Sequence, residues 1–186
     1  DNLLLNPGAE EGTEHWTAVL GPIESLEGGE CDSVPPHGGS RLFAVGGICS
    51  DESDEGAAYQ RVDLSPWSEA IDGGQATAVY GGWMRNYGSS DRPELAVAML
   101  HENGSELTRS EPLSSATGSW TEMLSTVPLP IGTRSADFHL YGTRNAGSDN
   151  DSYFDDLSLR LLINNGSPGD DDDDSSDDDD SSDDDD

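Results

Sequence analysis

Lysine is absent from this sequence: all eight of its basic residues are arginines, set against 39 aspartates and glutamates. The formal net charge at pH 7 is −31. Proteins that bind nucleic acid or anionic lipid surfaces need a basic face, so the sequence predicts neither kind of partner. The acidity instead suits cation binding, solubility at high salt, or both.

Long hydrophobic runs and helical periodicity are missing as well. Hydrophobic residues make up 32% of the chain, and no run approaches the roughly 20 apolar residues of a membrane span, so membrane insertion is not expected. Catalytic signatures are also lacking, because the four histidines are scattered and no HExxH, GxSxG or P-loop occurs. We therefore expect a binding or structural module and not an enzyme.

Cysteine is scarce, with only Cys31 and Cys49, and both lie in glycine- and acid-rich segments. A disulfide that closes this loop would suit an exported protein, secreted or at the cell surface. The start at Asp1, without methionine or signal peptide, agrees with a mature product. Two unpaired thiols remain the alternative, and a zinc site is not expected because no CxxC pair exists.

The C-terminal segment 170–186 contains only aspartate and serine. With no apolar group to offset the entropy of ordering, it is expected to be disordered and extended. The sequence thus predicts a β-domain over residues 1–163 and, over 164–186, a Gly/Ser/Pro linker with an acidic tail. The tail could condense cations weakly or serve as a spacer, and it resembles the acidic segments of biomineral proteins.

What the sequence does contain is a series of short apolar or alternating segments separated by turn-forming residues. About ten such strands predict an all-β sandwich or barrel. The Gly81-Gly82 pair within one strand predicts a bulge or a close backbone approach. The predicted strands are residues 2–5, 15–19, 40–46, 58–64, 76–87, 94–101, 105–109, 118–127, 134–143 and 152–163.

Both ends of the sequence carry a family resemblance. Residues 2–12, NLLLNPGAEEG, followed by Trp16, resemble the opening of galactose-binding-like jelly-roll domains. These domains include carbohydrate-binding modules of the family 4/9/22 type and the sugar-binding domains of F-box proteins. Residues 153–159, YFDDLSL, resemble the closing strand. Over residues 2–162 the resemblance implies an antiparallel jelly-roll β-sandwich and a polysaccharide or glycan as partner.

The resemblance also implies a structural calcium ion between the first turn and the last strand. Calcium takes about six to eight hard oxygens, and Glu10 and Asp156 are the expected carboxylate ligands. Asp155 lies beside Asp156, and strand alternation is expected to send only one of the two to the site. The turn at Gly39 and Ser40 can add carbonyl oxygens. The alternative is a solvated acidic turn whose strand aspartates cap backbone groups.

Two further acidic clusters, at 51–55 and 149–151, would bind cations weakly or are solvated loops. For sugar binding, an aromatic platform needs planar polar neighbours, and Trp83, Arg85 and Tyr87 would share one face of a strand. Each aromatic could instead be a core residue. The remaining ligand-binding candidates are Trp67, Tyr141 and Arg144.

Three functions fit these features. The first is a calcium-stabilised, non-catalytic carbohydrate-binding module of an exported protein. The second is a structural or adhesive surface domain with the same fold and no sugar site, which self-associates into a filament or coat. The third is a calcium- or mineral-binding protein that acts through the Asp/Ser tail. A fold by itself does not choose among them.

Overall fold

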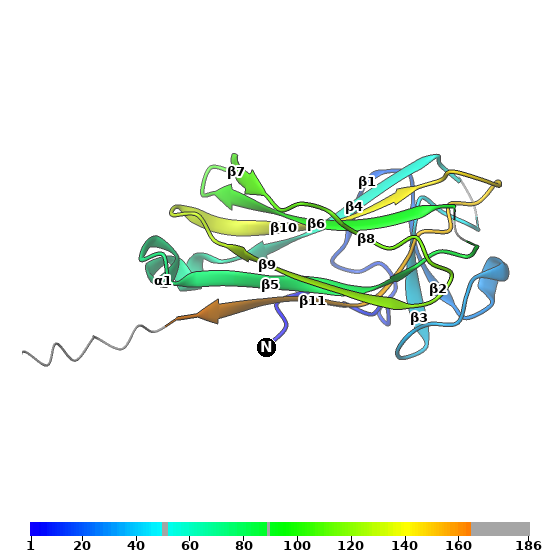
Figure 1. The fold of residues 1–186 in the computed structure, drawn as a ribbon, viewed down its shortest axis with the longest axis horizontal. Coiled ribbons are helices and arrows are strands. Elements are labelled where there is room, and N and C mark those ends of the chain that lie inside the picture. The colour runs from blue at the N-terminus through cyan, green and yellow to red at the C-terminus, as the bar shows by residue number, and fades with distance from the viewer. Residues whose placement is uncertain (50–51, 89, 165–186) are drawn as a thin grey trace, which may run out of the picture.

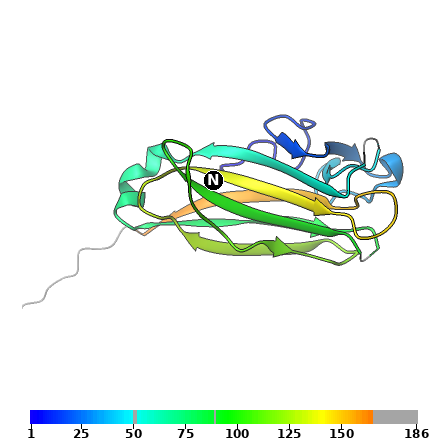
Figure 2. The ribbon, with the colours of Figure 1, turned by 90° about the horizontal axis from the view of Figure 1, so that it is seen from above.

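The computed structural model describes residues 1–49, 52–88 and 90–164, in which two antiparallel β-sheets pack face to face (Figure 1). The six-stranded sheet has the order β1-β4-β10-β6-β7, with β8 also paired to β6, and the five-stranded sheet has the order β2-β3-β11-β5-β9. Seen from above, most strands run along the long axis of the molecule (Figure 2). The predicted all-β sandwich is confirmed.

The elements of the described residues are eleven strands and three short helical turns. None of these helices is long and apolar enough to cross a membrane. The bounds are β1 Thr17–Leu20, β2 Ile23–Glu27, η1 Glu30–Asp32, β3 Arg41–Val45, β4 Glu55–Asp63, η2 Ser65–Trp67, α1 Ser68–Asp72, β5 Ala76–Arg85, β6 Arg92–His101, β7 Glu106–Arg109, β8 Leu113–Ser114, β9 Thr121–Pro128, β10 Thr133–Thr143 and β11 Tyr153–Ile163.

The main core lies between the two sheets and is built by alternation along their central strands. In β4 every second residue from Gly56 to Val62 is buried. Phe138 of β10 is fully buried and packs edge-on against Trp16, with ring centroids 6.1 Å apart. Trp16 also packs on Phe43 of β3 at 5.3 Å. These aromatics come from both sheets, so they join the two layers.

A smaller apolar cluster lies near β2 and β3 and is closed by the disulfide between Cys31 and Cys49. The two Cα atoms are 5.3 Å apart, and Cys49 packs against the cluster. The predicted disulfide is therefore confirmed. The buried members of this apolar cluster are Leu26, Val34, Leu42, Ala44, Ile48 and Tyr153.

The prediction of a strand over residues 2–5 is wrong. Leu3 donates one backbone hydrogen bond to the carbonyl of Leu159 at 2.8 Å, but Leu5 is 56% exposed and is bonded through its backbone to the Gln60 side chain. The Gln60 side chain of β4 thus makes the hydrogen bonds to Leu5 that the backbone of a neighbouring strand would otherwise make. The segment lies over the edge between the two sheets instead of inside one of them.

Two strands, β2 and β8, were not predicted. The sequence of β2, IESLE, carries two glutamates, which mask its alternation, and β8 has only two residues. At the C-terminus, β11 ends at Ile163, and the predicted tail lies outside the described residues. The division at residue 163 therefore stays a prediction.

Replacing Phe138 by alanine should lower the free energy of unfolding by about 3–5 kcal/mol, because it empties a space between the sheets that neighbouring strands cannot close. Urea denaturation measures the change. Leu162→Ala is the control, since Leu162 is 53% exposed on β11 and should alter stability little. Equal effects of the two substitutions would contradict the described core.

Candidate functional site

A β-bulge in β11 shapes the acidic end of the last strand. Asp155 pairs with Trp83 of β5, but the next paired residue, Ser158, is opposite Gly81, so β11 has an extra residue here. Asp156 has a φ of 43°. The bulge breaks the side-chain alternation of the strand. Regular alternation therefore does not separate the two aspartates, and which of them reaches the predicted calcium site stays a prediction.

Both aspartates contact the turn that precedes β3. The buried Asp155 accepts backbone hydrogen bonds from His37 at 2.8 Å and Gly38 at 3.0 Å through Oδ2, and from Asp156 at 2.8 Å through Oδ1. Asp156 Oδ2 lies 2.6 Å from His37 Nδ1. Burial raises the pKa of Asp155 to about 6, although the hydrogen bonds from Gly38 and Asp156 oppose this shift.

Glu10 binds the other end of the same turn. Its Oε1 accepts the N–H groups of Ser40 at 2.8 Å and Arg41 at 3.0 Å, and its Oε2 accepts the Ser40 hydroxyl at 2.6 Å. The hydrogen bonds from Ser40 and Arg41 hold the pKa of Glu10 below its usual value. Gly39 has a φ of 59°, and a Cβ there would collide with the Glu10 carboxylate. The positive φ favours glycine at this position, and a side chain there would also displace the Glu10 carboxylate from its hydrogen bonds.

The fold thereby brings Glu10 and the adjacent pair Asp155 and Asp156, which is far from Glu10 in sequence, onto one short turn. In this arrangement Ser40 presents its hydroxyl and N–H group to Glu10. A second acidic group, Glu11, Glu14 and His15, lies on the surface nearby in sequence. It is the one set of three acidic or histidine side chains in residues 1–49, 52–88 and 90–164 whose ligand atoms all lie within 4.8 Å of one another.

The outer face of the six-stranded sheet carries a row of three rings. Tyr59 of β4 lies directly opposite His139 of β10, and their ring centroids are 5.7 Å apart. Tyr141 follows along β10 and stacks on His139 at 5.6 Å with planes 6° apart. Burial, and next the charge of Arg109, lower the pKa of His139 and so favour its neutral form. Its buried Nε2 has no hydrogen-bond partner in the described chain.

Arginine–carboxylate pairs flank this row, which we call the ring row. Arg61 donates two hydrogen bonds of 2.7 Å to Asp137, and its guanidinium lies 5.9 Å from the centre of the Tyr59 ring. Arg109 donates to the Tyr141 hydroxyl at 2.7 Å and to Glu106 at 2.6 Å. The surface therefore combines flat apolar rings with fixed polar groups.

Of the six predicted ligand-binding residues, only Tyr141 lies in the ring row. Trp83 and Arg85 lie on the outer face of β5 in the other sheet, alternating with buried residues. Tyr87 lies beyond the end of β5, is 61% exposed, and lines with Arg85 a cleft of about 570 Å³ beside Cys31.

The last two candidates lie elsewhere. Trp67 ends η2 and packs against the core, and Arg144 bonds to the Asp54 side chain and the Ser148 carbonyl.

The sequence did carry a signal for the ring row. Tyr59 and Arg61 alternate in β4, as do Asp137, His139 and Tyr141 in β10. Alternation shows that each set shares a face, but it does not show that β4 and β10 are neighbours. That pairing joins segments about 80 residues apart and follows only from the sheet order.

No family model matches this chain, and no curated protein matches it in sequence. Solved structures do match its fold. A family 16 carbohydrate-binding module is 18% identical with a TM-score of 0.55, over 87% of this chain and 99% of that chain. A family 61 module solved with β-1,4-galactotriose is 15% identical with a TM-score of 0.55, over 88% and 99%. The C-terminal family 22 module of Clostridium thermocellum Xyn10B is 14% identical with a TM-score of 0.52, over 84% and 91%.

The same fold also forms part of larger proteins. The enzymatically active domain of bacteriophage CBA120 tailspike protein 4 is 14% identical with a TM-score of 0.59, over 87% of this chain but only 21% of that chain. These likenesses define the architecture, which is the jelly-roll β-sandwich of carbohydrate-binding modules. The predicted resemblance is therefore confirmed at the level of the fold.

The buried carboxyl of Asp155 predicts a pH dependence for the metal-free protein. Its pKa rises from 3.8 to about 6 on folding, so the folded state holds this proton more tightly than the unfolded chain. The resulting stabilisation is complete below pH 3.8 and is lost as the pH rises through 6. A shift of two pKa units corresponds to roughly 3 kcal/mol.

Urea denaturation in EDTA between pH 4 and pH 7 measures this contribution. The wild-type free energy of unfolding should fall over that window more than that of Asp155→Asn, which has no proton to lose. Parallel pH profiles for the two proteins would refute the assignment.

Proposed function

We propose that this domain is a non-catalytic carbohydrate-binding module of an exported protein, that the ring row holds the glycan, and that a calcium ion joins the chain ends. The ring row is the observation that carries the proposal. Sugar rings stack their C–H faces on aromatic rings, and their hydroxyls bond to planar polar groups, here the Arg61–Asp137 and Arg109–Glu106 pairs.

The glycan class that fits best is a neutral, extended oligosaccharide. The arginines beside the ring row are already neutralised by their carboxylates, and the net charge of −31 opposes polyanions. A family 61 module of the same fold has been solved with β-1,4-galactotriose, and a protein that joins a family 22 module to a xylanase module has been solved with xylohexaose; both sugars are neutral. The disulfide supports export, because such bonds persist in oxidising compartments.

Calcium fits the turn that Glu10 and the two aspartates share. Asp156 has only His37 as a side-chain partner, and Gly8, Gly38 and Gly39 leave the space beside the carboxylates free of side chains. A bound Ca²⁺ would supply positive charge to hard oxygen ligands from Glu10 and Asp156, with Asp155, Ser40 and the Gly39 backbone around them. Its role would be to hold the N-terminal segment against β11.

Tyr59→Ala and Tyr141→Ala should each weaken glycan binding about tenfold or more, because each removes part of the stacking platform. A glycan array followed by titration calorimetry measures the loss. Tyr87→Ala is the matched control, since it removes an exposed tyrosine far from the ring row.

The pattern across these variants decides between the functions. Loss of binding in Tyr87→Ala alone would move the site to the loop end and refute the ring row. Failure of the wild-type protein to bind any glycan, together with self-association at raised concentration, would favour a structural surface domain.

Removal of calcium should lower the melting temperature by roughly 5–10 °C relative to protein saturated with calcium. Without the ion the neighbouring carboxylates lack a compensating charge. Glu10→Gln and Asp156→Asn should melt at the same temperature with calcium and with EDTA. Glu11→Gln, which alters the exposed cluster beside the site, should keep the calcium response. A wild-type protein whose melting ignores EDTA would exclude a structural calcium ion.

A further inference from the structure

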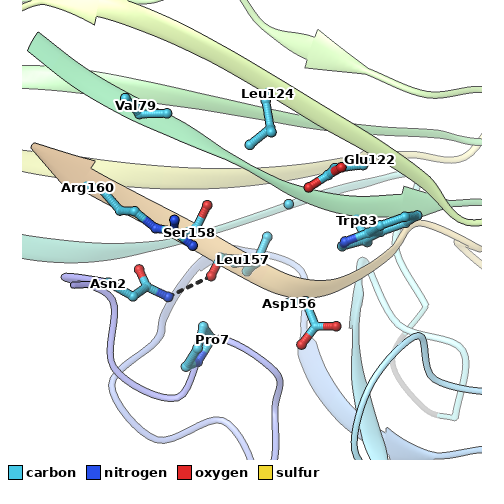
Figure 3. Close-up of a pocket in the computed structure, with 11 residues that line it drawn as sticks. Asn2, Pro7, Val79, Trp83, Glu122, Leu124, Asp156, Leu157, Ser158 and Arg160 are labelled. Atoms are coloured by element: carbon cyan, nitrogen blue, oxygen red, sulfur yellow. Dashed lines mark hydrogen bonds between the residues drawn. The ribbon is translucent and has the colours of Figure 1, made fainter. Parts of the chain in front are cut away.

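The outer face of the five-stranded sheet, opposite the ring row, contains a groove of about 400 Å³ (Figure 3). It crosses β9, β5 and β11 and is bounded by the N-terminal segment. Trp83 lies at one end and Arg160 at the other, with Leu124 and Glu122 on the β9 side (Figure 3). Asn2 and Pro7 bound the β11 side.

The backbone creates this groove. Gly82 of β5 lines the groove, and a Cβ there would approach the Leu157 side chain to 2.6 Å. A Cβ on the adjacent Gly81 would collide with the backbone carbonyl oxygen of Met123 in β9. The predicted close backbone approach is thus confirmed, and the bulge lies in the neighbouring strand β11. Together the two irregularities leave a hollow where regular strands would carry side chains.

Two charged side chains without an ion-pair partner, Arg160 and Glu122, line the groove. Six of the eight arginines form ion pairs with carboxylates, and within the described residues Arg85 and Arg160 form none. Both lie on this face of the sheet. The Glu122 side chain, also exposed, likewise forms no hydrogen bond or ion pair within the described residues.

Arg160 and Glu122 do not neutralise each other. Arg160 is opposite Val79, and Glu122 is opposite Trp83. These two positions of β5 are four residues apart, which corresponds to about 13 Å along a strand. In a chain with 39 acidic residues, an exposed arginine without a carboxylate partner marks a surface with hydrogen-bond donors available to a ligand.

We propose that this groove is a second glycan-binding site, distinct from the ring row. Trp83 supplies an aromatic wall, Val79 and Leu124 supply apolar contact, and Arg160 and Glu122 supply a donor and an acceptor for sugar hydroxyls. The ligand is a neutral oligosaccharide, because Glu122 and Asp156 both line the groove and repel anionic groups.

Trp83 is held in place from behind. The His37 ring stacks on it with centroids 3.7 Å apart and planes 15° apart, and His37 in turn bonds to Asp156. The platform therefore does not have to order itself when a ligand arrives, which lowers the entropic cost of binding.

Two sites on opposite sheets make the domain bivalent. A single glycan chain cannot lie along both outer faces of the sandwich, so each site binds its own chain and the domain bridges them. Bivalence raises retention on an insoluble polysaccharide without any new contact.

The test uses the full chain and titration calorimetry with xylohexaose and β-1,4-galactotriose. The wild type should bind two equivalents of at least one of these probes. Arg160→Ala/Glu122→Ala should bind one, and its melting temperature should be unchanged because neither side chain holds a partner. Trp83→Ala should bind one as well, with the affinity of the groove reduced at least about tenfold.

The complementary variant, Tyr59→Ala/Tyr141→Ala, should keep the groove and lose the ring row. Arg134→Ala is the control, because this arginine lies beside α1, away from both sites. One equivalent in the wild type, unaffected by Trp83→Ala and by Arg160→Ala/Glu122→Ala, would overturn the second site while leaving the ring row intact. One equivalent that survives in Tyr59→Ala/Tyr141→Ala and is lost in Trp83→Ala would refute the ring row and keep the groove. No binding of either probe would overturn both.

Discussion

The extra residue in β11 is the constraint on which the rest of the structure depends. It lets Asp155 turn inward to the backbone of His37 and Gly38 while Asp156 reaches the His37 ring. In a regular strand these two side chains would point to opposite faces. The same bulge lies beside Gly82, so it also opens the groove on the outer sheet face. The same bulge thereby positions both aspartates at the turn before β3 and helps to form the groove.

The N-terminal segment depends on this arrangement as well. Leu157, within the bulge, donates its N–H to the carbonyl of Pro7 at 3.1 Å, and the Asn2 side chain both donates to Leu157 and accepts from Leu159. Farther along the segment, the Glu10 carboxylate accepts hydrogen bonds from Ser40 and Arg41 and so ties the N-terminal segment to the turn before β3. The segment is short of regular ladder bonds, so its position relies on side chains and, in our proposal, on calcium. Such segments are the first to open when their polar partners are lost.

The two outer faces of the sandwich differ in how their charges are used. On the six-stranded sheet, Arg61 and Arg109 are bound to carboxylates and hold the ring row in a fixed arrangement. On the five-stranded sheet, Arg160 and Glu122 stay apart because the strand register separates them. The chain has eight arginines against 39 acidic residues. Six of these arginines form ion pairs within the protein and so stabilise its own structure. The exceptions lie on the face that carries Trp83.

Composition, alternation and the motifs at the two chain ends were sufficient to predict an all-β jelly roll and the disulfide. Alternation and turn residues are local properties, so they can be read from the chain directly. The irregular path of residues 2–5, the bulge at Asp156 and the neighbouring positions of Tyr59 and His139 followed only from the tertiary structure. Each depends on which strands are neighbours and in which register, and that is decided by packing between residues distant in sequence.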